Sequence, residues 1–483
     1  MKNYAHLYID GQWVEPSGPG TRELIDPTTE LPYATVSSGG GVEDVDRAVA
    51  AAKRAFATFS QTSVDERIAL IDRIVEEYER REEDLAQLIA AEVGVPISFR
   101  AQVTGPAAHM RVARDVLRSY HFERKIADTV VRREPIGVCA LISPWNWPIQ
   151  TSVIKAIYGI AAGCTVVLKP SDAAPLSGIA LAEVMHAAGV PAGAFNLVIG
   201  RGSVVGDALS RHPDVDMISF TGSTDAGIKV GEAAAQTVKR TCLELGGKSA
   251  LVVLQDADLE KAARFNVQRG FSNSGQSCHA PTRMLVHESQ VEAVLRYLLE
   301  EIACIRIGDP RDRATTMGPL VHAAQFASVQ RHVEIGLAEG GRLVTGGHGR
   351  PDGIERGFFA RPTVLADVTP GMTLAREEVF GPVLVVMPYR TEDEAVEMAN
   401  DSIFGLGGYV FSEDRRRGYE VASRLRAGRI SYNGANTNSL TPMGGYKQSG
   451  VGRSMGVFGL EEYLEIKSMY GFEDEAHALP SYS

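Results

Sequence analysis

The sequence predicts an α/β protein built on a doubly wound parallel sheet. From residue 138 onward, short apolar runs alternate with segments whose apolar residues recur at helical spacing. The apolar runs are hydrophobic at nearly every position, which is typical of strands buried on both faces. Such alternation implies right-handed crossovers with helices on both sides of the sheet. Ligands of these sheets bind beyond the carboxyl ends of the strands, so functional motifs are expected there.

The predicted elements follow in a regular order. Residues 1–40 contain turns and short strands, residues 42–91 and 105–120 are helical, and residues 122–138 form a polar, extended arm. Beyond the arm, strands are expected at 138–142, 165–168, 195–199 and 217–220, with helices at 152–163 and 176–188. A second α/β region has expected strands at 250–254, 284–286, 383–387 and 408–411, and a helix at 257–271.

Composition limits the classes of function. The 483 residues suffice for about two to four domains, and 44% hydrophobic with 23% charged residues is typical of a soluble globular protein. A net charge of -11 argues against broad nucleic-acid binding. Neither a signal peptide nor a run of about 18 apolar residues is found, so no membrane partner is expected. Five scattered cysteines without CxxC spacing predict no disulfide framework and no metal site, which fits a reducing cytoplasm.

One cysteine lies in a setting suited to nucleophilic chemistry. Cys278 ends the run NSGQSC, whose small and amide residues leave room for a carbonyl carbon to approach the thiol. Neighbouring backbone N–H groups could stabilise the oxyanion that forms on attack. A buried structural cysteine is the alternative, because that is the commoner fate of a lone thiol.

Two strand ends carry candidate nucleotide-binding residues, although no correctly spaced GxGxxG is present and the run 200–206 has one residue too many. The run FTGSTDAG ends a strand and opens a helix. Gly222 and Ser223 would therefore present free backbone N–H groups and the positive helix end to a pyrophosphate. Lys169 and Asp172 end another strand and could bind ribose hydroxyls or a phosphate. An ordinary capped turn and a solvated turn are the alternatives.

Two further motifs offer an oxyanion donor and a base. The run PWNWP at 144–148 forms a stiff loop, in which the Asn146 amide could donate to an oxyanion. The run LELGGK at 243–248 places Glu244 at an apolar strand end, where burial raises a carboxyl pKa and suits a general base near neutral pH. A structural aromatic corner and an ion-paired glutamate are the respective alternatives.

Two more motifs, EEVFGPV at 377–383 and PMGGYK at 442–447, complete an ordered set of seven with PWNWP, KPS, FTGST, LELGGK and GQSC. In this order and spacing, the set resembles the NAD(P)-dependent aldehyde dehydrogenase superfamily over essentially the whole chain. The resemblance implies a Rossmann-like NAD(P)-binding domain, a second α/β catalytic domain, and a small β oligomerisation arm with a tail. Their implied bounds are 1–120 with 137–246, then 247–446, and finally 121–136 with 460–483.

The resemblance also implies a role for each site residue. Cys278 would attack the aldehyde, the resulting thiohemiacetal would pass a hydride to NAD or NADP, and Glu244 would activate water to hydrolyse the thioester. Asn146 would stabilise the oxyanion, and Lys155 would join a proton path. The implied cofactor-binding residues are Ser143, Trp145, Lys169, Ser171, Asp172, Gly202, Gly206, Phe220, Gly222, Ser223, Leu245, Glu378 and Phe380. The implied substrate tunnel is lined by Trp147, Thr151, Ile154, Ser277, His279, Thr437 and Met443.

Three positions qualify that resemblance. Asp172 stands where many relatives have Glu, and the shorter carboxylate could admit the 2′-phosphate of NADP. Ser454 stands where relatives often have Glu, which puts a proton relay there in doubt. His279 directly follows the nucleophile and is interpreted as a tunnel wall, because Glu244 already fills the role of base.

The implied tunnel has an aromatic wall, apolar surface and no evident cation, which favours a neutral, medium-sized apolar or aromatic aldehyde over a carboxylated semialdehyde. A CoA-acylating dehydrogenase is one alternative, although such relatives usually lack the base at Glu244. A non-catalytic protein on the same fold is another alternative. The joint presence of Cys278, Glu244 and Asn146 argues against it. The expected partners are an aldehyde and further copies of the chain, in a cytoplasmic homodimer or homotetramer.

Overall fold

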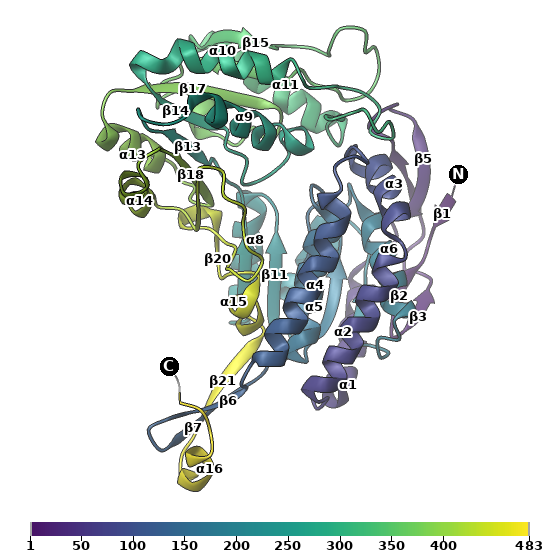
Figure 1. Cartoon of the computed structure of the whole chain (residues 1–483). Helices are drawn as coiled ribbons and strands as arrows, with labels where there is room; N and C mark the ends of the chain where they lie inside the picture. Colours follow the sequence, from purple (N-terminus) through teal and green to yellow (C-terminus); the bar gives the residue numbers. More distant parts are fainter. Residues whose placement is uncertain (1, 482–483) are drawn as a thin grey trace.

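The computed structural model describes residues 2–481 as two α/β lobes and a projecting arm (Figure 1). One lobe carries most of the N-terminal half of the chain, and the other carries most of the C-terminal half. The arm extends away from the first lobe and contains strands from both halves. Within residues 2–481, no helix combines the length and hydropathy that a membrane crossing requires.

The first lobe is built on an eight-stranded sheet with the order β20-β12-β11-β8-β9-β10-β2-β3. Its five central strands run parallel: β12 (Arg240–Glu244), β11 (Met217–Thr221), β8 (Val138–Ile142), β9 (Thr165–Lys169) and β10 (Phe195–Leu197). The antiparallel edges are β2 (Leu7–Ile9), β3 (Gln12–Val14) and β20 (Gly450–Val451). Every residue of β8 and β9 is buried, as the uniform apolar runs predict.

Local hydrogen bonds at a capping box divide the helical region at the start of the first lobe. The predicted helical stretch 42–91 is divided into α1 (Val42–Phe59), α2 (Val64–Glu79) and α3 (Glu82–Val93). The break before α2 is a capping box: the Ser63 hydroxyl accepts from the Glu66 N–H at 3.2 Å, and the Ser63 N–H donates to the Glu66 carboxylate at 2.7 Å. The remaining helices are α4 (Ala101–Ser119), α5 (Pro148–Ala162), α6 (Pro175–Ala187), α7 (Asp207–Arg211), α8 (Thr224–Ala235) and α15 (Gly456–Glu461).

The second lobe is a seven-stranded sheet, parallel except for its edge strand β15. In spatial order its strands are β15 (Arg342–Thr345), β16 (Thr363–Ala366), β17 (Val383–Tyr389), β14 (Arg283–His287), β13 (Ala250–Val253), β18 (Gly407–Phe411) and β19 (Arg429–Tyr432). Successive residues of β13 enter separate hydrophobic clusters, because side chains alternate across a strand. One cluster is covered by α9 (Leu259–Gly270) and α10 (Val291–Ile302), and the other by α11 (Ala323–Ala338), α13 (Glu392–Asn400) and α14 (Arg415–Arg424).

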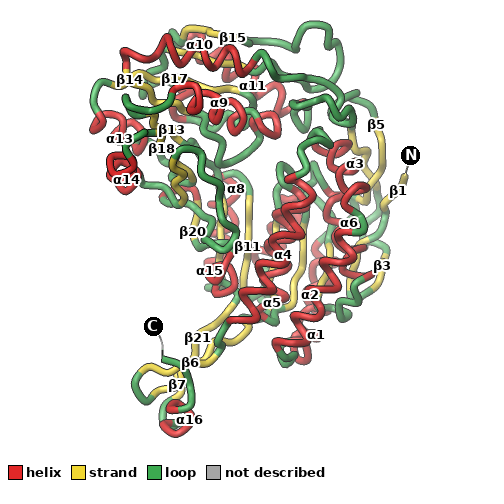
Figure 2. Tube along the Cα trace, in the orientation of Figure 1, coloured by secondary structure: helices red, strands yellow, loops and turns green. Residues whose placement is uncertain are grey.

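The arm, a small sheet and two short helices lie outside these two sheets (Figure 2). The predicted arm forms β6 (Glu123–Ile126) and β7 (Thr129–Pro135), and β7 pairs with β21 (Leu464–Met469) near the C-terminus. A three-stranded sheet joins β1 (Lys2–Tyr4), β5 (Pro32–Ser37) and β4 (Thr21–Ile25). Short helices are α12 (Thr373–Arg376) and α16 (Glu473–His477). Residues 482 and 483 of the predicted tail lie outside the described residues, and the predicted domain bounds stay predictions.

The chain returns to the first lobe after completing the second. Strand β20 pairs antiparallel with β12, which sets Gly450 opposite Glu244. A side chain at Gly450 would bring its Cβ to 1.9 Å from the Leu243 carbonyl oxygen, and its φ of +142° lies in the region that favours glycine. The C-terminal segment therefore closes tightly over the strand that carries Glu244.

The second sheet offers a test of core packing. Leu251 of β13 is fully buried, whereas Leu343 of β15 is 43% exposed. Leu251→Ala should lower the free energy of unfolding of this lobe by about 2–5 kcal/mol, because a cavity would remain in the core. Leu343→Ala, the matched control, should change it by less than about 0.5 kcal/mol. Equal losses in denaturant unfolding of the two variants would contradict the assigned packing.

Candidate active site

A cavity of about 500 Å³ lies between the two lobes. The first lobe contributes α4, α5 and the carboxyl ends of β11 and β12, as expected for a ligand site of a parallel sheet. The second lobe contributes α9, β18, β19 and the loop that ends at Cys278. Cys278, Glu244, Asn146 and Lys155, the four predicted catalytic residues, all line this one cavity.

The loop before Cys278 has an unusual backbone. Asn273 and Ser274 have left-handed φ angles of 52° and 55°, and Gly275 follows at 74°. Left-handed conformations are costly for residues with a side chain, so surrounding contacts must hold them. Asn273 Nδ2 donates to the Asn146 carbonyl oxygen at 2.8 Å, and Ser274 Oγ donates to the Gly318 carbonyl oxygen at 2.8 Å. A Cβ at Gly275 would lie 2.1 Å from the Gly381 carbonyl oxygen, so only glycine fits there.

The Cys278 thiol is partly exposed and faces the cavity. Burial raises its pKa to about 12, and the carboxylates of Glu378 and Glu244 add to the increase. Backbone N–H groups of Cys278 and His279 oppose that increase. The thiol is therefore protonated at neutral pH and must lose its proton when it attacks an electrophile.

His279 is a weak candidate for the acceptor of that proton. Its Nδ1 lies 4.0 Å from the Cys278 Sγ atom. Burial, reinforced by the charges of Arg429 and Arg269, lowers its pKa to about 4. The ring is therefore neutral and weakly basic, and it lines the cavity wall as predicted.

The Asn146 side chain is suited to oxyanion binding. Its Nδ2 donates to the Gln276 carbonyl oxygen at 3.0 Å. An amide nitrogen carries two donors, so one remains for a ligand in the cavity. The backbone carbonyl of Asn146 accepts from Gln102 Nε2 at 3.0 Å and from Asn273 Nδ2, which locks the loop in place.

Glu244 ends β12 and is buried, with 5% of its surface exposed. Burial raises its pKa to about 7, while Lys155 and the Ser454 hydrogen bond oppose the increase. Ser454 Oγ donates to Oε1 at 3.1 Å, but within residues 2–481 Oε2 has no hydrogen-bond partner. Glu244 is thus a carboxylate with one oxygen available for a water proton. Ser454 keeps a contact with the base, although it lacks the ionisable group of a glutamate.

Lys155 lies behind the base. Its Nζ donates to Ser219 Oγ at 2.9 Å. Burial lowers the pKa of Lys155, and the charge of Glu244 opposes that effect. An ammonium that donates to a hydroxyl can pass a proton to it, which is compatible with the predicted path.

Several predicted cofactor residues have hydrogen-bonding capacity left for a ligand. Lys169 Nζ donates to the Pro170 carbonyl oxygen at 2.9 Å and to Asp172 at 3.1 Å, so one of its three donors stays free. Asp172 also accepts from the Gly202 N–H at 3.2 Å. Space is open around Gly202, where an added Cβ would meet no atom within 4 Å. Ser171 and Asp172 together line one hollow on the protein surface.

The residues predicted to lie near the nicotinamide ribose form a second group. Glu378 Oε1 accepts from the Gly247 N–H at 2.9 Å, and burial raises the Glu378 pKa to about 7. Trp145 and Phe380 pack edge to face, with ring centroids 5.3 Å apart. These residues fit a nucleotide whose ribose hydroxyls need acceptors and whose rings need an aromatic wall.

Most of the other residues predicted to bind the cofactor make contacts within the protein. Ser143 Oγ accepts from Ser152 Oγ at 2.8 Å, and Leu245 packs where a side chain at Gly227 would clash. Ser223 caps α8 by accepting from the Ala226 N–H at 3.3 Å. The prediction of a free N–H at Gly222 is wrong, because that group donates to the Glu244 carbonyl oxygen at 3.1 Å. In the first turn of α8, the N–H groups of Thr224 and Asp225 have no partner within residues 2–481 and remain for a phosphate.

The predicted tunnel lining is largely found in the cavity wall. Six of the seven predicted residues line the cavity: Trp147, Thr151, Ile154, His279, Thr437 and Met443. Ser277 does not, which corrects the prediction. Its hydroxyl instead accepts from Trp147 Nε1 at 3.1 Å and holds that ring against the cavity.

The expectation of a lining without a cation is wrong. Arg429 of β19 and Arg269 of α9 both line the cavity, as do His109 of α4 and Tyr409 of β18. These residues lie outside the seven motifs, so motif matching missed them. Only the arrangement of the two lobes around one cavity brings them together.

Comparison with known proteins accounts for this arrangement. The model of the aldehyde dehydrogenase family matches residues 13–469. The chain belongs to this family. The predicted family, the α/β fold class and the oxidation of an aldehyde are thereby confirmed.

Similar proteins span the whole chain. A 3-succinoylsemialdehyde-pyridine dehydrogenase of Pseudomonas sp is 48% identical over 98% of this chain and 100% of its own. A Pseudomonas syringae aldehyde dehydrogenase, solved as a mutant with NAD+ and octanal, is 49% identical with a TM-score of 0.95, covering 97% and 96% of the two chains. An aldehyde dehydrogenase from Bartonella henselae is 42% identical with a TM-score of 0.95, covering 97% and 99%.

The raised pKa of Glu244 predicts a pH dependence. Below about pH 7 the carboxyl is protonated and cannot accept a proton, so kcat for aldehyde oxidation should rise through about pH 7 and then level off. Glu378 has a similar pKa, so Glu378→Gln serves as the control and should leave the inflection in place. An inflection that follows Glu378 instead, or a kcat that is flat from pH 6 to 8, would contradict this assignment.

Proposed function

We propose that this aldehyde dehydrogenase uses NAD+ to oxidise its aldehyde to a carboxylic acid, through an adduct on Cys278 that water activated by Glu244 hydrolyses. One observation carries the proposal: the Cys278 thiol, a free donor of Asn146 and the unpartnered Oε2 of Glu244 share one cavity. Nucleophile, oxyanion donor and base are the groups that this reaction needs.

The first step forms a bond between Cys278 Sγ and the carbonyl carbon. The thiol proton leaves to water in the cavity, which the partly exposed Cys278 faces, so this step does not require Glu244. The carbonyl oxygen becomes an oxyanion, which the Asn146 amide stabilises with its second donor. Removing one such donor typically costs about 100- to 1000-fold in rate.

Bound NAD+ supplies the acceptor for the hydride that leaves the tetrahedral carbon. Lys169 and Asp172 would hold the adenosine ribose, α8 the pyrophosphate, and Glu378 the nicotinamide ribose. Four solved structures of similar proteins contain NAD+, which supports this cofactor. NADP+ is the alternative, because the short carboxylate of Asp172 leaves space near the ribose.

The second step restores the free thiol. Glu244 takes a proton from water, the oxygen adds to the thioester carbon, and the Cys278 sulfur leaves and takes the proton from Glu244 as the carboxylic acid forms. The free Oε2 of Glu244 favours water over CoA as the acyl acceptor, because it gives the water a proton acceptor. The CoA-acylating alternative therefore has less support.

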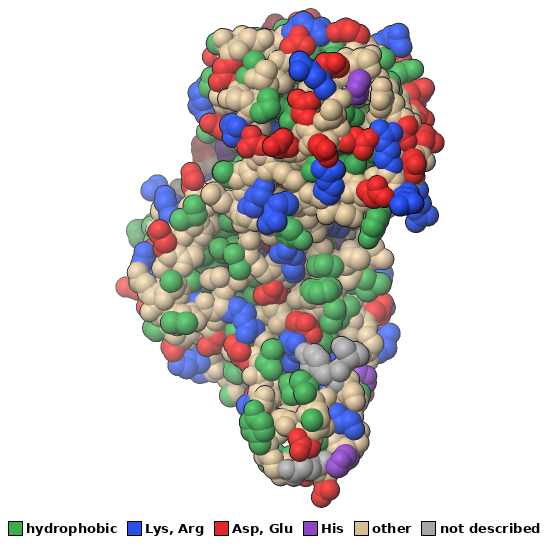
Figure 3. Space-filling view, turned by 90° about the vertical axis from the view of Figure 1, so that its left-hand side faces the viewer, with side chains coloured by type: hydrophobic (Ala, Val, Ile, Leu, Met, Phe, Trp, Pro, Cys, Tyr) green, Lys and Arg blue, Asp and Glu red, His purple; other side chains and the backbone are tan. Residues whose placement is uncertain are grey.

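Assembly and location are part of the proposal. The arm exposes apolar side chains, including Ile126 at 53%, Ile466 at 59% and Tyr470 at 76%. Exposed apolar strands of this kind pair across subunits, so we propose a homodimer or homotetramer in the cytoplasm. Figure 3 shows acidic and basic side chains interspersed over one face of the protein.

Substituting the base separates the two steps. Glu244→Gln should release a burst of NADH and then turn over at least about 100-fold more slowly, because the thioester forms but water lacks its proton acceptor. Stopped-flow absorbance at 340 nm measures both phases, and mass spectrometry of the quenched protein detects the acyl group. Glu232→Gln, on the exposed face of α8, is the matched control and should behave as the parent enzyme.

The same assay tests the whole proposal. The parent enzyme is assayed with octanal and NAD+ or NADP+, with and without CoA. Acyl-CoA as the product, or unchanged steady-state turnover of Glu244→Gln, would overturn the assigned route. No NADH or NADPH from any member of a broad aldehyde panel would overturn the function.

A further inference from the structure

The cavity has an unpaired positive charge in its wall. Arg429 begins β19 and is only partly exposed, and its side chain has neither an ion pair nor a hydrogen bond within residues 2–481. Burial lowers its pKa, whereas Tyr409, Glu244 and Cys278 act in the opposite direction. A guanidinium carries five donors and stays charged in proteins, so Arg429 can give a ligand in the cavity several hydrogen bonds at once.

A second polar residue lines the cavity from the other lobe. His109 of α4 is 7% exposed, and its Nδ1 has no hydrogen-bond partner within residues 2–481. Burial lowers its pKa to about 4, and the charge of Arg429 contributes. The imidazole is therefore neutral and offers one donor and one acceptor. Arg429 and His109 thus present hydrogen-bonding groups to one cavity from both lobes.

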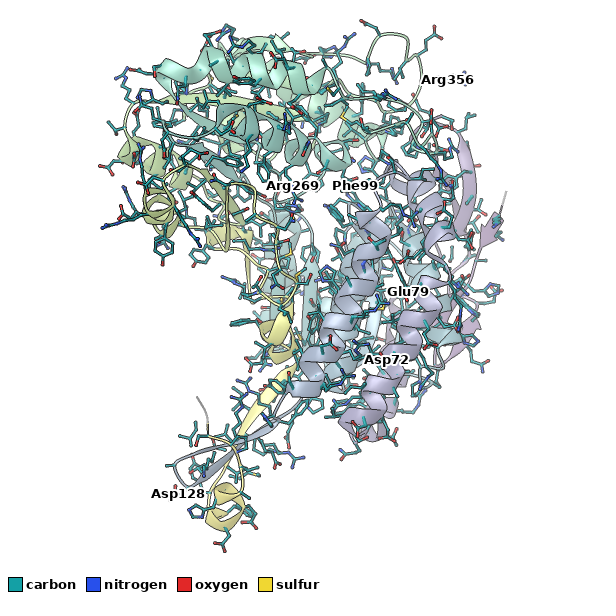
Figure 4. The ribbon with its side chains drawn as sticks, viewed as in Figure 1. Asp72, Glu79, Phe99, Asp128, Arg269 and Arg356 are labelled. Carbon is teal, nitrogen blue, oxygen red and sulfur yellow. The ribbon has the colours of Figure 1, made fainter. Side chains whose placement is uncertain are left out.

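The remaining charges favour a negatively charged ligand. Arg269 of α9 is exposed and lines the same cavity, with its guanidinium carbon 5.9 Å from the centre of the Phe265 ring. Figure 4 places Arg269 at the boundary between the two lobes. Glu244 is the only acidic residue among the described lining residues, and its pKa of about 7 leaves it partly protonated. Two arginines therefore outweigh one partial negative charge.

We propose that the substrate is an aldehyde whose far end carries a carboxylate, which Arg429 binds with a donor from His109 and with Arg269 nearby. The inference rests on the proposed function, since it assigns the substrate of that same cavity. An arginine can bind a carboxylate through two parallel hydrogen bonds, which fixes orientation as well as affinity. A volume of about 500 Å³ accommodates a chain with a second polar end. The aldehyde end then meets Cys278 while the acid end remains at β19.

The test compares substrates that differ in charge and little in shape. Succinic and glutaric semialdehyde are assayed against their methyl esters with NAD+, and kcat/KM is measured for each. The enzyme should prefer each acid over its ester by about tenfold or more, the scale of hydrogen bonds to a charged group. Equal rates, or a preference for the ester, would overturn the carboxylate and indicate a neutral end instead.

Variants assign the preference to Arg429. Arg429→Met should lower the acid-to-ester ratio of kcat/KM about tenfold, and Arg429→Lys should restore part of it, because lysine keeps the charge without the bidentate geometry. The ratio cancels any effect on Cys278 or Glu244 that both substrates share. Arg416→Met, on the exposed face of α14, is the matched control and should leave the ratio unchanged.

The outcomes separate this inference from the proposed function. A full acid preference in Arg429→Met would overturn the role of Arg429. The comparison of acid with ester in the parent enzyme needs no variant, so it decides the inference even if Arg429→Met does not fold. Oxidation of the esters and of octanal without any acid preference would leave the proposed function standing and remove only this inference. Absence of NADH with every substrate would instead remove the proposed function.

Discussion

The hydrogen-bond network around Asn146 is the constraint on which the active site depends. Its backbone carbonyl accepts from Gln102 of α4 and from Asn273 of the nucleophile loop, and its side chain donates to Gln276 of that loop. Asn146 follows β8 in the first lobe, whereas the loop belongs to the second. The network therefore sets the oxyanion donor and the nucleophile at a defined separation, and it holds a strained backbone that would otherwise relax.

Burial then determines the protonation states in the cavity. It raises the pKa of Cys278 to about 12 and that of Glu244 to about 7, and it lowers that of His279 to about 4. The thiol is consequently a neutral nucleophile, the glutamate a base poised near neutral pH, and the histidine a wall. Arg429 and His109 line the same cavity and can hydrogen-bond a ligand there. The protonation states and these contacts both depend on a cavity between the lobes, where electrostatic interactions are stronger than in bulk water.

Much of the site was predictable because its residues lie in contiguous motifs at strand ends. Glu244 and Lys169 end buried strands, and parallel strands direct their carboxyl ends to one edge of a sheet. Two predictions were wrong because a polar group has an alternative hydrogen-bond partner in the folded chain. Ser277 turns away from the cavity to bind Trp147, and the Gly222 N–H is consumed by the neighbouring strand. Sequence spacing does not encode those choices, because they depend on neighbours distant in the chain.

The sequence by itself determined the fold class and the family, and it predicted the nucleophile, the base and the oxyanion donor, since each rests on local pattern and motif order. Only the tertiary structure decided which other side chains share their cavity. Arg429, Arg269 and His109 come from β19, α9 and α4, which are separated by more than a hundred residues and carry no motif. Packing of the two lobes joins them at one cavity, and their charges and hydrogen-bonding groups make them informative about the substrate.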